Sequence, residues 1–187
     1  MKLKNLLTEL EYVVDQGSIE REVTMLCYHT KQIEHNSVFV CIVGEKSNGH
    51  QYIKEAINKG AVVLVVSEMV HEFIPDTITI IRVEDTRHAL SYMSATYFDY
   101  PAKKLKMIGV TGTKGKTTTT YMIKEILEMA GIKTCLIGTI ETIIGTHVIP
   151  SNNTTPESYL LQKYLKEAVD TEGLLGLFMG GFKAGAV

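Results

Sequence analysis

The sequence contains no tryptophan, and only four prolines and three cysteines among its 187 residues. The odd cysteine count, without paired spacing, excludes the small secreted domains that depend on a disulfide framework. Cys41 and Cys135 lie in apolar runs. We therefore interpret both, together with Cys27, as buried thiols in a reducing cytosol rather than as redox or metal-binding groups.

An excess of charge of either sign is also missing. The formal net charge is −2, which gives no electrostatic reason to expect a nucleic acid as partner. We find neither a signal peptide nor a transmembrane run, so we expect a cytoplasmic protein without a membrane partner. Apolar residues make up 45% of the chain, enough to bury a core in one domain or in two small ones.

Predicted strands and helices alternate along the first half of the chain, which favours a parallel sheet with helices on its faces. Residues 1–17 predict an amphipathic helix, whose apolar face is formed by Leu3, Leu6, Leu7, Leu10, Val13 and Val14. Strands are predicted at 37–44, 61–68 and 78–83, and helices at 50–60 and 84–98.

The alternation is interrupted near Pro101, where a proline and a basic pair separate two units. Beyond it, strands are predicted at 106–110 and 133–140, and helices at 116–131 and from Pro156, with Thr155 as N-cap. We predict an α/β protein of two units, 1–102 and 103–187, each with a largely parallel sheet flanked by helices. The second sheet is expected to be incomplete, with exposed strand edges.

The stretch GVTGTKGKTTTT, from Gly109 to Thr120, lies between a predicted strand and a predicted helix. In that context, backbone N–H groups of the loop and of the helix N-terminus converge on one point and favour an anion there. Lys116 is expected to reach terminal phosphates, and the Thr117 hydroxyl is expected to bind a Mg²⁺ that bridges them.

The loop departs from the usual phosphate-loop pattern, G-x-x-x-x-G-K-[ST], because Val110 stands where that pattern has its first glycine. Its glycines lie at 109, 112 and 115 instead. The alternative is a glycine-rich turn with a solvated lysine. The preceding strand, the following helix and the intact G-K-T favour the phosphate loop.

This variant loop resembles the ATP loop of the Mur ligases, which carry G-T-x-G-K-T. Three further stretches support the resemblance. SVFVCIVGEKSNGHQYIKEAINKGAVVLVV (37–66) resembles the family's sugar-nucleotide domain, and LIGTIETIIG (136–145) resembles the strand and hairpin after its first ATPase helix. NTTPES (153–158) resembles the substrate loop of the tripeptide-synthetase subgroup, which adds the third residue of the peptidoglycan stem peptide.

The resemblance implies an ATP-dependent acid–amino-acid ligase of peptidoglycan precursor synthesis, acting in cell-wall biogenesis, cell shape and cell division. It would add the third amino acid, diaminopimelate or lysine, to UDP-MurNAc-L-Ala-D-Glu. Residues 1–102 would bind the UDP-muramyl peptide, and 103–187 would form the N-terminal part of a P-loop-type ATPase domain. ATP and Mg²⁺ would be the cofactors, the partners would be small molecules only, and a monomer is expected.

The site residues carried over from the family fall into two groups. Lys116 would be catalytic, stabilising charge on the transferring phosphoryl group, and Thr117 would be the metal ligand. ATP would be bound by Gly112, Thr113, Lys114, Gly115, Lys116, Thr117 and Thr118. The UDP-muramyl peptide would be bound by Thr30, Asn48, Gly49, His50, Asn153, Thr154 and Thr155.

Two of these assignments have alternatives that depend on local chemistry. Thr-Pro-Glu is good helix-capping sequence, so the segment from Asn153 to Thr155 could be a plain cap. His50 could contact the sugar nucleotide or be a turn histidine. The remaining histidines, His35, His71, His88 and His147, are interpreted as surface residues.

One stretch departs from the subgroup. Where the subgroup has an Asp-Ser-Arg turn, this chain has His29, Thr30 and Lys31. Thr30 keeps the hydroxyl that would contact uridine, whereas Lys31 keeps the charge without the planar fork of arginine. The difference leaves room for a paralogue with another nucleotide sugar.

The tail, EGLLGLFMGGFKAGAV, has five glycines in its last fifteen residues and no recognisable helical or strand period. The family continues there into a strand with a metal-binding glutamate, and later into an amino-acid-binding domain. A one-base shift within the codon of Met179 could restore such a segment, Trp-Glu-Val-Ser. We therefore expect a truncated or frameshifted ligase, inactive alone. The alternatives are a natural short protein that only binds ligands, or another P-loop enzyme such as a small kinase.

Overall fold

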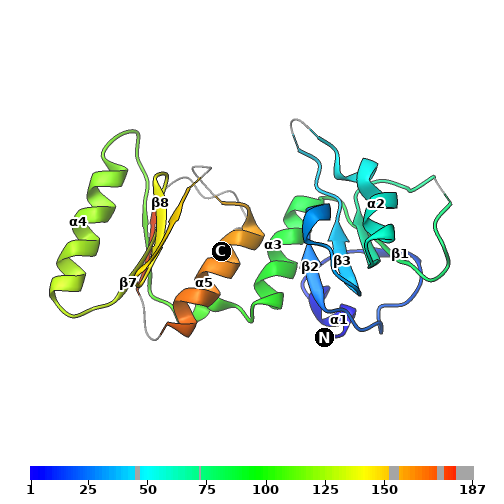
Figure 1. The fold of residues 1–187 in the computed structure, drawn as a ribbon, viewed down its shortest axis with the longest axis horizontal. Coiled ribbons are helices and arrows are strands. Elements are labelled where there is room, and N and C mark those ends of the chain that lie inside the picture. The colour runs from blue at the N-terminus through cyan, green and yellow to red at the C-terminus, as the bar shows by residue number, and fades with distance from the viewer. Residues whose placement is uncertain (45–46, 72, 152–155, 172–174, 180–187) are drawn as a thin grey trace. The chain divides into compact units, whose positions relative to one another are not determined.

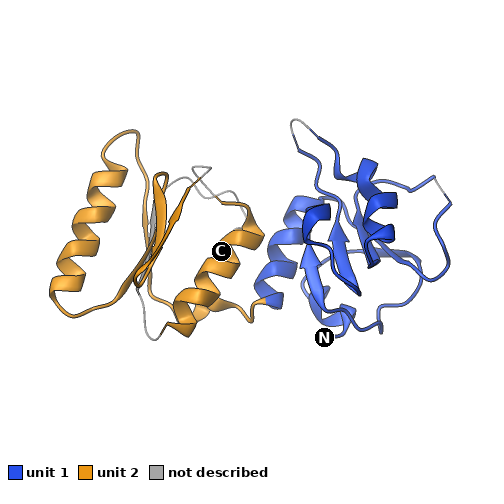
Figure 2. Ribbon diagram, viewed as in Figure 1, with its two compact units in different colours: residues 1–97 blue, residues 98–187 orange. Residues whose placement is uncertain are grey.

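The computed structural model of the chain describes residues 1–44, 47–71, 73–151, 156–171 and 175–179, the last segment as backbone only. It forms two compact units, Met1–Tyr97 and Phe98–Val187 (Figure 2). The division falls a few residues before the predicted boundary at 102. Each unit is a sheet with helices packed on it, so the α/β class predicted from the sequence is confirmed (Figure 1).

The first unit contains a five-stranded sheet with the order β1-β5-β4-β3-β2. Strands β2 to β5 are parallel, and β1 pairs antiparallel with β5 at one edge. The strands are β1 (Val13–Gln16), β2 (Met25–Cys27), β3 (Ser37–Val40), β4 (Ala61–Val66) and β5 (Thr79–Arg82). The helical segments are α1 (Leu3–Leu6), η1 (Thr30–Gln32), η2 (Gly49–Tyr52), α2 (Ile53–Asn58) and α3 (Thr86–Tyr97).

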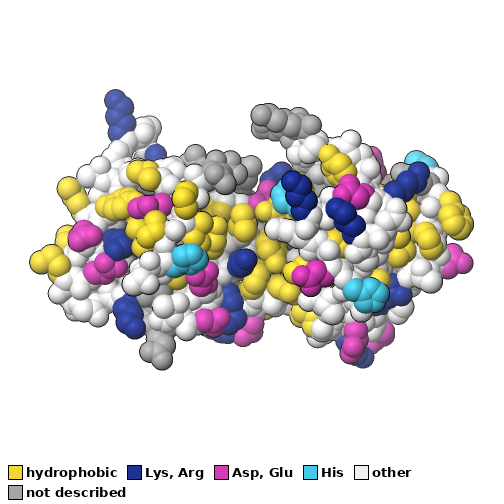
Figure 3. Space-filling view, viewed as in Figure 1, with side chains coloured by type: hydrophobic (Ala, Val, Ile, Leu, Met, Phe, Trp, Pro, Cys, Tyr) yellow, Lys and Arg dark blue, Asp and Glu magenta, His cyan; other side chains and the backbone are white. Residues whose placement is uncertain are grey.

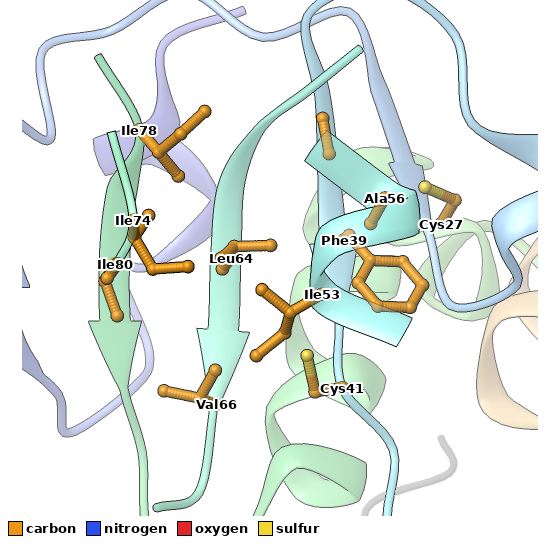
Figure 4. Close-up of a cluster of buried hydrophobic side chains, with 11 residues drawn as sticks. Cys27, Phe39, Cys41, Ile53, Ala56, Leu64, Val66, Ile74, Ile78 and Ile80 are labelled. Carbon is orange, nitrogen blue, oxygen red and sulfur yellow. The ribbon is translucent and has the colours of Figure 1, made fainter. Parts of the chain in front are cut away.

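Both faces of this sheet are buried. Successive residues of β3 and β4 point to opposite faces, and nearly all of them are apolar and buried. Phe39 and Leu64 point to the face covered by α2, where Ile53 and Ala56 meet them (Figure 4). Val38 and Val63 alternate with them and are fully buried on the other face. Near-continuous apolar strands of this kind are typical of parallel sheets with helices on both sides.

The predicted N-terminal helix over 1–17 is wrong beyond its first turn. Helix α1 ends at Leu6, and Val13–Gln16 forms strand β1. Val13 and Val14 are exposed rather than buried on a helix face. Tertiary pairing outweighs the helical spacing, since β1 gains a ladder with β5 and an ion pair in which Arg82 Nε lies 2.9 Å from Asp15 Oδ2.

The second unit contains a five-stranded sheet with the order β6-β10-β7-β8-β9. β6, β10 and β7 are parallel, whereas β8 and β9 continue the sheet as an antiparallel hairpin. The strands are β6 (Met107–Val110), β7 (Thr134–Ile137), β8 (Glu141–Ile144), β9 (His147–Pro150) and β10 (Leu175–Met179). The helical segments are η3 (Pro101–Lys104), α4 (Lys116–Met129) and α5 (Ser158–Asp170).

Strand β10 corrects the interpretation of the tail. Leu175–Met179 was expected to have no regular structure, yet it lies between β6 and β7 and pairs with both. A strand in the centre of a parallel sheet needs no polar–apolar alternation, so the absence of a period did not exclude a strand here. The glycines of the tail made its short apolar run hard to recognise. The β6 strand, which leads into the glycine loop, is an edge of the sheet among the strands described.

Helix α5 packs on this sheet through Leu161, Leu165 and Ala168, which meet Cys135 and Ile137 of β7. The helix begins at Ser158. The side chain of Glu157 accepts a hydrogen bond from the backbone N–H of Ser158. The N-cap is therefore Glu157 and not the predicted Thr155, which lies outside the described residues. Within the described part of the chain, no helix is long and apolar enough to cross a membrane.

Candidate functional site

The glycine loop joins the end of β6 at Val110 to the start of α4 at Lys116. Gly112 (φ +146°) and Gly115 (φ +79°) adopt backbone conformations that side-chain-bearing residues rarely take. A Cβ atom at Gly115 would find nothing within 4 Å. The space above the N-terminus of α4 is thus open, and the exposed loop can take an anion at the positive end of the helix.

Lys116 spans this loop. Its Nζ donates a 2.7 Å hydrogen bond to the carbonyl oxygen of Gly112. The ammonium is therefore bonded back to the loop that precedes it, at the N-terminal end of α4. The role predicted for Lys116 at the terminal phosphates stays a prediction.

The four threonines after Lys116 have separate positions. Thr120 is fully buried, and its hydroxyl donates to the carbonyl oxygens of Lys116 (3.1 Å) and Thr117 (2.9 Å). Thr117 and Thr118 instead line an open groove beside the loop. Thr119 is exposed as well. The hydroxyls of Thr117 and Thr118 are the candidates to bind a metal or a ligand because they border the groove.

The groove has a volume of about 730 Å³ and is lined by Thr117, Thr118, Tyr121, Met122, Glu125, Ile126 and Ile140. Tyr121 donates a 2.6 Å hydrogen bond to Glu141 Oε1. Burial and this carboxylate raise the pKa of Tyr121 to about 12, so its hydroxyl stays protonated. This pair could not be predicted from sequence patterns, because Tyr121 lies in α4 and Glu141 in β8.

The outer face of α4 is apolar. Met122 is 61% exposed, Ile126 66% and Met129 87%, whereas Thr120 and Lys124 face inward. Hydrophobic side chains accordingly gather over α4 in Figure 3. On the inner face, Lys124 Nζ contacts Glu128 Oε2 at 2.6 Å, and Thr134 donates to Glu128 Oε1 at 2.7 Å. Burial would raise the pKa of Glu128, but these two contacts lower it below its usual range.

The second candidate site lies in the first unit, at the carboxyl ends of β2 and β3. Thr30 belongs to η1, which follows β2, and the turn from Asn48 to His50 follows β3. Because β2 and β3 are parallel neighbours, the topology brings both segments to one edge of the sheet. Ligands of open α/β sheets bind at this edge. Thr30 is half-buried, and His29 and Lys31 beside it are exposed.

Gly49 is a point of close backbone approach. A Cβ atom there would lie 2.7 Å from the backbone nitrogen of Ile42 and 2.8 Å from the carbonyl carbon of Cys41. The Gly49 N–H also donates a 2.8 Å hydrogen bond to the Ile42 carbonyl. The turn therefore requires glycine at this position for packing reasons.

His50 is buried, with 8% of its surface exposed. Its Nδ1 lies 2.6 Å from Asn48 Oδ1, and its Nε2 accepts a 3.1 Å hydrogen bond from the backbone N–H of Ser67. Burial lowers the pKa of His50, while Glu68, whose Oε1 is 3.7 Å from Nδ1, raises it by a smaller amount. Both ring nitrogens are thus used within the fold.

Several predicted residues remain without a described position. Asn153, Thr154 and Thr155 lie outside the described residues. His35, His71, His88 and His147 are exposed, as expected for surface residues. Cys27, Cys41 and Cys135 are free and buried, also as expected. Among the described residues, no group of three or more His, Cys, Asp or Glu is arranged to hold a metal ion.

Comparison with known proteins agrees with the fold and the loop. Residues 22–98 match the model of the Mur ligase family, catalytic domain, and residues 110–177 match that of the Mur ligase middle domain. The chain belongs to the Mur ligase family.

Two curated relatives bear the name of one particular ligase within this family. The chain is 49% identical over 170 residues to UDP-N-acetylmuramoyl-L-alanyl-D-glutamate--2,6-diaminopimelate ligase of Clostridium perfringens, and the match covers 91% of the chain and 35% of that protein. It is 39% identical over 171 residues to the ligase of the same name from Bacillus licheniformis, covering 91% of the chain and 34% of the relative. The chain therefore spans about a third of the length of these relatives.

Solved structures agree in fold. The structure of a UDP-N-acetylmuramoyl-L-alanyl-D-glutamate--2,6-diaminopimelate ligase matches with a TM-score of 0.75 at 17% identity, over 97% of this chain and 36% of that one. MurF from Acinetobacter baumannii matches with a TM-score of 0.62 at 22% identity, over 97% of this chain and 36% of that one. At such identities the likeness supports the fold.

Proposed function

We propose that the second unit binds Mg-ATP through the loop from Gly112 to Thr118. The observation that carries this proposal is the strand–loop–helix geometry with Lys116 Nζ placed 2.7 Å from the Gly112 carbonyl oxygen. When ATP binds, Lys116 exchanges this bond for contacts to phosphate oxygens, and the loop N–H groups hold the same phosphates. Thr117, which follows Lys116 in the G-K-T sequence, supplies the hydroxyl for the Mg²⁺.

The first unit binds the nucleotide sugar of the same reaction. Thr30 and the turn from Asn48 to His50 lie at one edge of the sheet, where the exposed Asn48 and Lys31 are accessible to a polar ligand. Asn153, Thr154 and Thr155 belong to the same function, on the resemblance of NTTPES to the family's substrate loop.

The whole protein is an ATP-dependent ligase of peptidoglycan precursor synthesis. The names of the relatives specify diaminopimelate as the amino acid added to the UDP-muramyl dipeptide, and this choice is part of the proposal. Thr117 would hold the Mg²⁺, which would supply charge neutralisation, and Lys116 would stabilise the charge on the phosphoryl group in transfer to the substrate carboxylate. The amine then displaces phosphate to form the amide. The expected setting is the cytoplasm, with a monomeric protein and small-molecule partners.

The residues of this chain by themselves support binding of the two ligands, and binding is the experiment that tests the proposal. Calorimetry with Mg-ATP and, separately, with UDP-MurNAc-L-Ala-D-Glu should give one site for each ligand. Phosphate release that requires diaminopimelate is the corresponding assay for the ligase reaction, with lysine as the competing amino acid. A chain that binds neither nucleotide would contradict the proposal.

A further inference from the structure

The surroundings of His50 suggest a role other than the two alternatives given above, which were a contact with the sugar nucleotide and a plain turn histidine. Its ring lies between two segments that are distant in sequence. One is the turn after β3 that contains Asn48, and the other is the residue after β4, Ser67. β3 and β4 are parallel neighbours, so the ring joins their carboxyl ends at the edge of the sheet where the nucleotide sugar is proposed to bind.

The hydrogen-bond directions determine the state of the ring. The Ser67 N–H can only donate, so Nε2 must be an unprotonated acceptor. Asn48 Oδ1 can only accept, so Nδ1 must carry the hydrogen. The same Oδ1 accepts the backbone N–H of His50 at 3.0 Å, which identifies it as the amide oxygen. Only the neutral Nδ1–H tautomer satisfies every contact.

We propose that His50 is a positioning residue, which in its neutral Nδ1–H form clamps the Asn48–Gly49 turn to the end of β4 and so shapes the binding edge without touching the nucleotide sugar. The role in binding rests on the proposed function. Protonation places a hydrogen on Nε2, opposite the Ser67 N–H, and opens the clamp. The site therefore loses its shape in acid.

The surroundings oppose protonation of the ring. Glu68 is the charged group that faces His50 among the described residues, and at 3.7 Å from Nδ1 it favours the charged form. Its side chain is 62% exposed, so water screens this effect. Burial of the ring acts in the other direction and is the larger influence, so the pKa of His50 lies below its ordinary value.

The clamp is tested first without any ligand. Nitrogen-15 NMR of the imidazole at about pH 7.5 should show the Nδ1–H tautomer, and titration should give a pKa below about 6.5. Replacing His50 by Ala should remove the hydrogen-exchange protection of the Ser67 amide. An Nε2–H tautomer, or a Ser67 amide that is indifferent to the substitution, would overturn the proposal.

The second measurement is calorimetry with UDP-MurNAc-L-Ala-D-Glu, with His71→Asn as control because His71 is exposed in a loop. His50→Asn can retain the donor to Asn48, and His50→Gln can retain the acceptor for Ser67, but neither can do both. Each should weaken binding about five- to tenfold and abolish the loss of affinity that the parent and the control show as the pH falls through the folded-state pKa of His50. Affinity that does not change with pH in the parent would contradict the clamp.

Asn48→Asp separates the clamp from a direct contact. A carboxylate can still accept from Nδ1, and its charge should raise the pKa of His50, moving the acid loss of binding to higher pH. If Asn48→Asp loses affinity at the same pH as the parent, the proposal is contradicted. If the parent binds no nucleotide sugar while the tautomer and the Ser67 amide are as expected, the proposed function fails and the clamp stands as a feature of the fold.

Discussion

The ammonium of Lys116 and the carbonyl oxygen of Gly112 form a 2.7 Å hydrogen bond across the glycine loop. Lys116→Ala removes this bond together with the ammonium that α4 places beside the loop. Mg-ATP binding should weaken by about 2 kcal/mol, the scale of a charge-assisted contact. Calorimetry checks this, with Lys133→Ala as control because Lys133 lies beyond the other end of α4. Equal affinity of Lys116→Ala and the parent would disprove the phosphate loop.

Thr117 gives a prediction about the metal rather than about the nucleotide. Thr117→Ala removes the hydroxyl proposed to bind Mg²⁺, so the gain in ATP affinity on adding Mg²⁺ should largely disappear. Thr117→Ser keeps the hydroxyl and should keep the gain. Titrations with ATP in the presence of Mg²⁺ or of a chelator measure the difference. If the alanine and serine variants respond alike to Mg²⁺, Thr117 is not the ligand.

Gly49→Ala should destabilise the first unit. The added Cβ would lie 2.7 Å from the Ile42 backbone nitrogen, and backbone atoms cannot move aside cheaply. We expect a loss of about 1–3 kcal/mol in the free energy of unfolding, measured by urea denaturation. Gly44→Ala is the matched control in the same turn region, since its Cβ would meet only the Ser47 carbonyl oxygen at 3.3 Å and should cost less. Similar losses for both variants would contradict this account.

The three thiols should be unreactive in the folded protein. Burial raises the pKa of Cys27, Cys41 and Cys135 to about 12, so almost no thiolate is present at neutral pH. A chromogenic disulfide reagent should therefore label none of them until denaturant is added, and then all three. Rapid labelling of a thiol under native conditions would show that its strand opens locally.

The stability of the first unit should fall in mild acid because of His50. Its pKa in the folded protein is lowered by burial, so the unfolded chain binds the proton more tightly. The contribution of neutral His50 is complete above about pH 6.5 and is lost as the pH falls toward the folded-state pKa. Urea denaturation at about pH 7.5 and pH 5.5 measures the loss. His50→Gln should show a smaller loss than the parent, and an identical loss would exclude His50 as its source.

The glycine loop could be predicted from sequence because its information is local. A strand, G-K-T and a helix start follow one another within a few residues, and the chain keeps that order in space. The partners of His50 could not be predicted in this way, since Ser67 is brought to the ring only by the pairing of β3 with β4. The structure adds the contact with Ser67 to the local turn, and the role of His50 in binding stays a prediction.

The errors in secondary structure have a related origin. Leucine spacing at the N-terminus suited a helix, but the pairing of Val13 and Val14 with β5 outweighed local preference. On α4, periodicity cannot say which face is inward, and the structure places Thr120 and Lys124 inside and Met122 outside. These outcomes depend on contacts between segments far apart in the chain.

The position of β10 has a consequence for the order of assembly during synthesis. β6 and β7 do not pair with each other, because β10 lies between them and joins both. β6, the strand that leads into the glycine loop, therefore has no described ladder partner until residues 175–179 have left the ribosome. The sheet of the first unit needs nothing beyond Arg82 and can close much earlier. On a growing chain the sheet of the first unit thus forms first. The loop between β6 and α4 gains its supporting sheet only after this late, long-range closure, a step that is intrinsically slow.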